Sequence, residues 1–352
     1  MSNLLYFGDN AEGLRRLADM QISVDLVYID PPFGTSNEFL IDHHRANSIS
    51  ASGVPAYSDR SQGDEYLEAL ASRLWAIRGV MADQASIYVH IDTKMEHHVR
   101  LVMDEVFGAR NFRNSIARIK CNPKNFDRHS YGNIKDTILF YSKSPGPVTW
   151  NPQLEPLSDR QLYRLYPKTD ETGRRFTTTP LHAPGQTANG PTGQPWRGLD
   201  PPPGRHWRYP PDKLDELDAL GMIYWSANGN PRKIRYAAEA EGTLPQDVWQ
   251  YKDPQRPAYP TQKNAAMLER IISTSSNPGD TVLDCYAGSG TTLLQAASLG
   301  RRFIGMDNSP AARRVIERRL NDADLDYCLV SDPVMPIRST REKVAGIKII
   351  NS

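Results

Sequence analysis

The stretch TVLDCYAGSGTT, residues 281–292, is the most informative part of the sequence for the fold. Its first residues are apolar and end in an acid, Asp284, which is the pattern of a buried strand. The residues after Gly290 follow a helical pattern, and Gly288 and Gly290 lie in the turn between the two elements. Because glycine has no side chain, backbone at such a turn can approach a ligand closely. The sequence therefore predicts a strand, a ligand-binding turn and a helix.

A second acid lies at the end of the next predicted strand. Residues 302–307 predict the next strand, which ends in Asp307, 23 residues after Asp284. An acid at this place can accept hydrogen bonds from ribose hydroxyls. The glycine turn is not a complete GxGxxG, and it lacks the Gly-Lys-Ser/Thr of a phosphate-binding loop. We therefore expect a nucleoside cofactor without phosphates, such as S-adenosylmethionine. The glycines alone would also fit an ordinary tight turn.

Strands and helices alternate towards both ends of the chain. Residues 24–29, 85–91 and 137–141 are candidate strands, and residues 64–82 have apolar side chains at helical spacing. The alternation returns after about residue 259. This pattern predicts an α/β fold with a parallel, helix-covered sheet.

The middle of the chain, residues 142–258, has a different amino-acid composition. It holds 18 of the 27 prolines and five of the six tryptophans. Proline clusters break regular elements, whereas a disordered linker would lack this aromatic content. We therefore expect an ordered, loop-rich insertion. The tail, residues 331–352, suggests no function.

Composition narrows the class of protein. The chain has 352 residues, of which 39% are hydrophobic and 24% charged, an ordinary globular mixture. No run of about 18 apolar residues predicts a membrane helix, and the first residues do not resemble a secretory signal. Cys121, Cys285 and Cys328 are far apart. We expect neither disulfides nor a metal site, and a cytoplasmic protein.

A second motif, Asp30-Pro31-Pro32-Phe33, directly follows the candidate strand 24–29. The Asp30 carboxylate and the Pro31 carbonyl can accept the two hydrogens of an exocyclic base amine, which aims the nitrogen lone pair at an electrophilic methyl. The prolines stiffen the loop. Phe33 can stack on a base that has swung out of a duplex. The motif predicts amine methylation, although Asp-Pro-Pro is also ordinary turn chemistry.

Together, residues 30–33, 259–263 (YPTQK) and 284–290 (DCYAGSG) resemble the amino-methyltransferases of DNA, and more narrowly their beta group. In that group the catalytic motif precedes a target-recognition insertion and the cofactor motif comes last. The resemblance implies a Rossmann-like S-adenosylmethionine-dependent methyltransferase sheet with helices on both faces and permuted motif order. Residues 1–141 would be the catalytic half, 142–258 the target-recognition insertion, and 259–330 the cofactor-binding half.

The resemblance also implies roles for single residues. Asp307 would hold the ribose of S-adenosylmethionine, Thr261 and Lys263 would lie near its methionine part, and Asp9 near its adenine. The full set of implied cofactor residues is Asp9, Thr261, Lys263, Asp284, Tyr286, Ala287, Gly288, Gly290, Thr291 and Asp307. Cys285 stands where the family usually has proline, Tyr286 where it has phenylalanine, Tyr259 for a frequent histidine and Asn264 for a frequent proline. None of these departures removes a required chemical group.

Basic residues mark the expected DNA contacts. Residues 110–135 carry seven basic side chains and one acid, and the insertion interleaves arginines with aromatics. Such side chains neutralise phosphates and read base edges, although a charge run is also the usual mark of a solvated face. The predicted DNA-binding residues are Arg113, Arg118, Lys120, Lys124, Arg128, Arg197 and Arg208.

Three alternatives remain beside methylation of adenine N6 in duplex DNA. Within the family, Asp in the first motif position leans towards adenine and Ser towards N4 of cytosine, so Asp30 favours adenine. Similar motifs also serve RNA bases, but the long insertion ahead of the cofactor motif favours DNA. A catalytically inactive DNA-binding protein would not need an intact Asp30 and Asp307. The expected partners are double-stranded DNA, a second copy of the chain and a cognate restriction enzyme.

Overall fold

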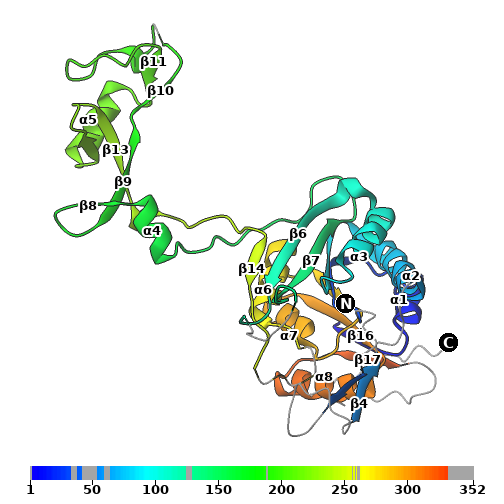
Figure 1. Cartoon of the computed structure of the whole chain (residues 1–352). Coiled ribbons are helices and arrows are strands. Elements are labelled where there is room, and N and C mark those ends of the chain that lie inside the picture. Colours follow the sequence, from blue (N-terminus) through cyan, green and yellow to red (C-terminus); the bar gives the residue numbers. More distant parts are fainter. Residues whose placement is uncertain are drawn as a thin grey trace. The chain divides into compact units, whose positions relative to one another are not determined.

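A computed structural model describes residues 2–32, 38–41, 54–58, 64–123, 129–187, 189–255, 257, 259 and 262–331 (Figure 1). Of the predicted site residues, Phe33, Lys124, Arg128 and Thr261 lie outside this part of the chain, as does the tail from residue 332.

The chain forms two compact units, Met1–Gln153 with Gln246–Ser352, and Leu154–Pro245. The first unit is built on a nine-stranded sheet with the order β14-β6-β7-β5-β2-β15-β16-β1-β17. Its strands are β1 (Leu4–Phe7), β2 (Val24–Ile29), β5 (Met81–Ile91), β6 (Phe112–Ile119), β7 (Lys135–Ser142), β14 (Val248–Gln250), β15 (Thr281–Asp284), β16 (Arg302–Asp307) and β17 (Cys328–Ser331). Neighbouring strands of this sheet are parallel, except that β7 runs antiparallel to β5 and β6.

Helices cover both faces of this sheet (Figure 1). They are α1 (Asn10–Asp19), α2 (Asp64–Val80), α3 (Glu96–Met103), α6 (Ala265–Ser275), α7 (Thr291–Ser298) and α8 (Pro310–Asp322). A π-helical turn (Asp104–Gly108) and a 3-10 turn (Ala109–Asn111) extend α3, and β3 (Glu38–Ile41) and β4 (Val54–Ser58) form a separate antiparallel pair. Asp9 and Ser309 cap α1 and α8 by accepting backbone hydrogen bonds, which explains where these helices begin.

Side-chain alternation along β2 produces two cores. Leu26 and Tyr28 pack into a cluster with α6, α7 and α8, whereas Val27 and Ile29 pack into a cluster with α1, α2 and α3. Successive strand residues point to opposite faces, so a continuous apolar strand must be covered on both sides. The predicted α/β fold with helices on both faces is confirmed. The permuted order is present too, because β2, the strand before the Asp30 motif, comes ahead of β15, the strand before the glycine turn, in the chain.

The second unit has its own small core. It contains α4 (Asp159–Leu165), β8 (Lys168–Thr169), β9 (Arg175–Pro180), β10 (His182–Pro184), β11 (Arg205–Trp207), α5 (Pro211–Ala219), β12 (Ile223–Trp225) and β13 (Pro231–Tyr236), with 3-10 turns at Pro191–Gly193 and Ala237–Glu239. Trp196 and Trp207 are buried, and their indole N–H groups donate to Asp215 and to the Gln194 carbonyl. The tryptophans thus pack an ordered core.

The unit is shorter than the insertion expected at residues 142–258. Residues 142–153 and 246–258 belong to the first unit, where β14 pairs with β6 through Val248 and Ala117. The proline content predicted loops, but it did not indicate that β14 pairs with β6 as an edge strand of the large sheet. Among the described residues, no helix has the length and apolar character needed to cross a membrane.

Close packing of α7 on β16 makes Gly305 sensitive to substitution. A Cβ at Gly305 would lie 3.2 Å from Cγ of the buried Leu293 and closer still to its methyl groups. We expect Gly305→Ala to lower the free energy of unfolding by about 1–3 kcal/mol, measured by urea denaturation. Gly79→Ala in α2 is the control, because its Cβ would meet nothing within 4 Å. Equal stability of the two variants would contradict this packing.

Candidate active site

The two sequence motifs meet because β2 and β15 are neighbours in the sheet. The strands are parallel, with Leu26 opposite Val282 and Val27 opposite Leu283. Neighbouring strands lie about 4.8 Å apart. Asp30 follows β2 and Asp284 ends β15, so the two loops leave the sheet side by side at the same edge. This edge, the carboxyl end of the strands, is where such sheets bind ligands.

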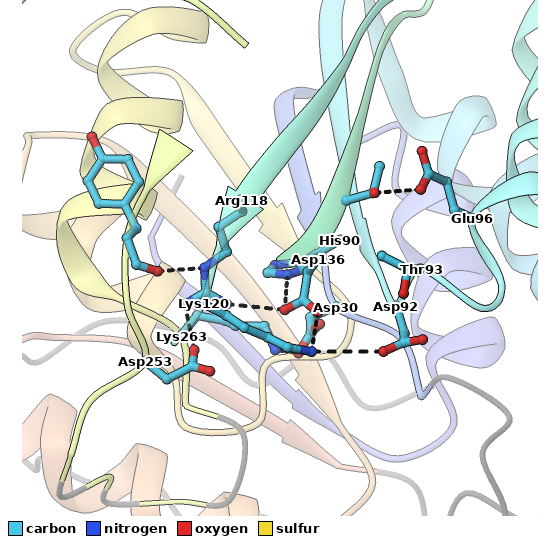
Figure 2. Close-up of polar contacts among 12 residues, drawn as sticks. Asp30, His90, Asp92, Thr93, Glu96, Arg118, Lys120, Asp136, Asp253 and Lys263 are labelled. Atoms are coloured by element: carbon cyan, nitrogen blue, oxygen red, sulfur yellow. Dashed lines mark hydrogen bonds and ion pairs between the residues drawn. The ribbon is translucent and has the colours of Figure 1, made fainter. Parts of the chain in front are cut away.

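Asp30 is held by a lysine from a third segment (Figure 2). Lys263 Nζ lies 2.6 Å from Asp30 Oδ2, and the two side chains are only 10% and 17% exposed. The other carboxylate oxygen, Oδ1, is buried and has no hydrogen-bond partner among the described residues. A buried oxygen without a partner is costly. A ligand that donates a hydrogen bond to Oδ1 would remove that cost.

The predicted glycine turn between β15 and α7 is present beside Asp30. Gly288 and Gly290 have φ values of +51° and +72°, which favour glycine. Asp307 at the end of β16 anchors the turn, because its carboxylate accepts the N–H groups of Gly288 and Ser309, each at 2.8 Å. Tyr259 packs against Gly288 and is itself buried. The acid predicted for ribose binding therefore also shapes the turn.

A residue that the sequence analysis missed supports the same turn. Arg319 of α8 donates from Nη1 to the Ser289 carbonyl at 2.6 Å and to Thr291 Oγ1 at 3.0 Å. Nothing in the local sequence around Arg319 distinguishes it from the other arginines of α8. Only the packing of α8 beside α7 shows that it holds the cofactor motif.

Three carboxylates gather at this edge of the sheet. The pKa of Asp284 is raised to about 7, chiefly by burial and also by the neighbouring charges of Asp30 and Asp307, while hydrogen bonds from Thr292 and the Tyr286 backbone oppose the shift. Burial also raises the pKa of Asp307. Opposite charge stabilises such a cluster, so these residues fit a cationic cofactor such as a sulfonium.

The start of α1 lies against the cofactor motif. Asn10 donates from Nδ2 to the Cys285 carbonyl at 3.0 Å. Asp9 caps the helix, with Oδ1 accepting from the Ala11 N–H at 2.7 Å, and Arg73 reaches its Oδ2 at 3.4 Å. The structure therefore brings the region of Asp9 to the turn that holds Tyr286 and Ala287.

A buried polar network lies behind Asp30 (Figure 2). The Tyr28 hydroxyl is 2.9 Å from His90 Nδ1, and His90 Nε2 is 3.2 Å from Asp136 Oδ2. Burial, aided by the Lys263 charge, lowers the pKa of His90, which favours its neutral form. Burial works against the charge of Asp136, but hydrogen bonds from His90 and Lys120 hold its pKa below the ordinary range. The network thus links β2, β5 and β7 next to Asp30.

Arg118 belongs to this network, and the prediction that it contacts DNA is wrong. Its side chain is fully buried, donating from Nε to the Tyr251 carbonyl at 2.7 Å and pairing with Asp136 and Asp253. Lys120 is a quarter exposed and binds Asp136 at 2.6 Å. In both cases a carboxylate of the protein pairs with the cation, and DNA contact by Lys120 stays a prediction.

The other described DNA-binding candidates keep exposed surface. Arg113 on β6 hydrogen-bonds Ser142 Oγ at 3.1 Å and the Gly146 carbonyl at 3.2 Å. In the second unit, Arg197 is about half exposed and pairs with acids of α5, and Arg208 is exposed with one hydrogen bond to the Pro180 carbonyl. Within the described ranges, no group of three or more His, Cys, Asp or Glu side chains is arranged to hold a metal ion.

Comparison with known proteins identifies the family. A family model described as DNA methylase, the N6/N4 methyltransferase model, matches residues 24–318. The chain is 39% identical over 325 residues to Type II methyltransferase M.EcaI of Enterobacter cloacae, covering 91% of this chain and 69% of M.EcaI. The chain belongs to the N6/N4 DNA methylase family.

Two further matches extend the comparison. The methylase is 25% identical over 323 residues to the Type III restriction-modification enzyme StyLTI Mod subunit of Salmonella typhimurium, covering 82% of this chain and about half (49%) of that subunit. It also resembles the crystal structure of an M1.HpyAVI–SAM complex, at 17% identity and a TM-score of 0.47, covering 90% of this chain and 99% of the other. Family membership confirms the predicted enzyme class, a DNA methyltransferase that uses S-adenosylmethionine.

The raised pKa of Asp284 predicts a pH dependence of cofactor binding. A bound sulfonium cation favours the charged carboxylate, so binding displaces a proton below the free-protein pKa of about 7. We expect the affinity for S-adenosylmethionine to rise as pH increases from about 5.5 to about 7 and then to level off. Isothermal titration calorimetry at several pH values measures this.

Two controls isolate the cause. S-adenosylhomocysteine lacks the sulfonium charge and should show a shallower rise, and Asp284→Asn should remove most of the dependence. An affinity for S-adenosylmethionine that stays flat across this range would refute the role of Asp284.

Proposed function

We propose that the methylase transfers a methyl group from S-adenosylmethionine to N6 of adenine in duplex DNA, after the target base has swung out of the helix. One observation carries the proposal: Asp30 leaves β2 beside the glycine turn after β15, and its buried Oδ1 has no partner among the described residues. A base amine would donate the hydrogen that this oxygen accepts.

The residues of the 30–33 motif would orient the target. Asp30 Oδ1 accepts one amine hydrogen and the Pro31 carbonyl accepts the other, which turns the nitrogen lone pair out of conjugation with the ring. Phe33 offers a face on which an extrahelical base can stack. Because a sulfonium is a good leaving group, the protein contributes orientation and charge placement and needs no strong base.

The cofactor would lie on the turn between β15 and α7. Gly288 and Gly290 let backbone approach it, Ala287, Tyr286 and Thr291 line the same turn, and Asp284 adds negative charge. Asp307 would bind the ribose hydroxyls through lone pairs that its backbone hydrogen bonds leave open. Thr261 would lie at the methionine part and Asp9 at the adenine. When bound, the cofactor supplies an activated methyl group at this edge of the sheet.

Asp30→Ala tests the role of the carboxylate. We expect methyl transfer to fall below detection or by at least about a thousandfold, since the amine loses its acceptor, while affinity for S-adenosylmethionine changes by less than about threefold. The measurements are nucleoside analysis of methylated DNA and equilibrium cofactor binding. Asp19→Ala is the matched control, because Asp19 is an exposed acid of α1 that pairs with Arg15. Unchanged turnover in Asp30→Ala would refute the proposal.

The same nucleoside analysis decides which base is methylated. Asp in the first motif position favours adenine. Wild-type product consisting of N4-methylcytosine alone would refute the adenine assignment. Methyl transfer to structured RNA in preference to duplex DNA would refute the choice of substrate.

DNA contact by the second unit is part of the proposal, with Arg208 as its exposed candidate. We expect Arg208→Ala to weaken DNA binding and to reduce the slope of log affinity against log salt by about one, because one phosphate contact is lost. Fluorescence anisotropy at several salt concentrations measures this effect. Equal DNA binding by wild type and Arg208→Ala would exclude that contact.

Arg118→Met should instead lower the free energy of unfolding by about 3–5 kcal/mol, because Asp136 loses a buried partner. Urea denaturation measures this effect.

We further propose a cytoplasmic enzyme that acts with a cognate restriction enzyme and forms a homodimer. The restriction-modification assignment is supported by the family and by the name of the StyLTI relative. The free cysteines Cys121, Cys285 and Cys328 fit a reducing compartment.

A further inference from the structure

The ion pair between Lys263 and Asp30 is unusual for a structural contact. Both side chains are more than four-fifths buried, and Nζ lies 2.6 Å from Oδ2. Buried ion pairs that serve stability normally have their remaining polar atoms hydrogen-bonded as well. Here Oδ1 has no partner among the described residues. The lysine therefore fixes one oxygen of the carboxylate and leaves the other for a ligand.

Lys263 is itself firmly placed. The next residue, Asn264, caps α6 by accepting the Met267 N–H, and its Nδ2 donates to the Lys252 carbonyl at 2.8 Å. On the other side, the Gln262 N–H donates to the carbonyl of the buried Tyr259 at 3.1 Å. The start of α6 also carries the positive end of the helix dipole, which adds to the favourable potential at a carboxylate.

The surroundings favour a cation at this place. Asp30, Asp284 and Asp307 lie at one edge of the sheet, and the charges of Asp30 and Asp307 both act on Asp284. Burial, together with the Lys263 charge, lowers the pKa of His90, the nearby titratable group of the buried network. Lys263, by contrast, is a cation that contacts Asp30 directly.

We propose that Lys263 is a positioning residue for Asp30. It binds Oδ2 and thereby sets the rotation of the carboxylate, so that Oδ1 faces the amine of the target base. This inference rests on the proposed function of Asp30. It differs from the place that the family resemblance implied for Lys263, near the methionine part of the cofactor.

The test separates the chemical step from cofactor binding. Lys263→Met removes the charge and keeps the length of the side chain, Lys263→Arg keeps the charge, and Lys143→Met is the control. Lys143 is a similarly buried lysine that pairs with Asp83 away from this edge. Two quantities are measured for each full-length variant: the equilibrium affinity for S-adenosylmethionine, and the single-turnover rate on unmethylated bacterial genomic DNA at saturating cofactor.

We expect Lys263→Met to slow the single-turnover rate by roughly 10- to 100-fold, because a carboxylate that rotates freely misplaces the amine. Its cofactor affinity should change by less than about threefold. Lys263→Arg should recover most of the rate, and Lys143→Met should match wild type.

Two results would overturn the proposal. In the first, Lys263→Met weakens cofactor binding at least about tenfold and keeps the wild-type rate at saturation, which would assign Lys263 to the cofactor. In the second, Lys263→Met and Lys263→Arg slow the single-turnover rate to the same extent, which would show that a positive charge at this position does not restore the rate. Wild-type product that is N4-methylcytosine would refute only the adenine assignment, because either amine needs the same oriented carboxylate.

Discussion

The parallel pairing of β2 with β15 is the constraint on which the site depends. The pairing sets Leu26 against Val282, so that the loops after the two strands start at neighbouring points of one edge. Both strands are buried between two helical layers, and a slip of register by one residue would turn apolar side chains towards the wrong core. The packing of the whole first unit therefore fixes the place of Asp30 relative to the glycine turn.

The pairing of the strands also brings several acidic side chains together at that edge of the sheet. Three acids lie where three strands end, and burial makes their charges costly, as the raised pKa of Asp284 shows. Lys263 neutralises part of this charge, and a sulfonium cofactor would neutralise more. Behind Asp30, the paired charges of Asp136 and Arg118 are satisfied within the protein. Asp30 Oδ1, a buried oxygen without a partner among the described residues, is the atom that we assign to the base amine.

Apolar pattern and turn chemistry were sufficient to predict much of the fold and of the site. The strand at 24–29 and the glycine turn are locally encoded, and the structure has both. The strand β6 was missed because its two arginines belong to the basic stretch 110–135, which was interpreted as a DNA-binding stretch. The partners that bury Arg118 come from β7 and from the segment after β14, and no local pattern reveals such contacts. The support given by Arg319 and Lys263 depends on packing in the same way.

The central claim is that the Asp30 carboxylate faces the methyl group of a cofactor bound at the glycine turn. A crystal structure of the full chain with sinefungin, whose amine replaces the transferable methyl, tests it most directly. We expect the sinefungin ribose at Asp307 and its amine directed into the space beside Asp30 Oδ1, with Lys263 still on Oδ2. Sinefungin bound away from the turn, or with its amine directed away from Asp30, would contradict the claim.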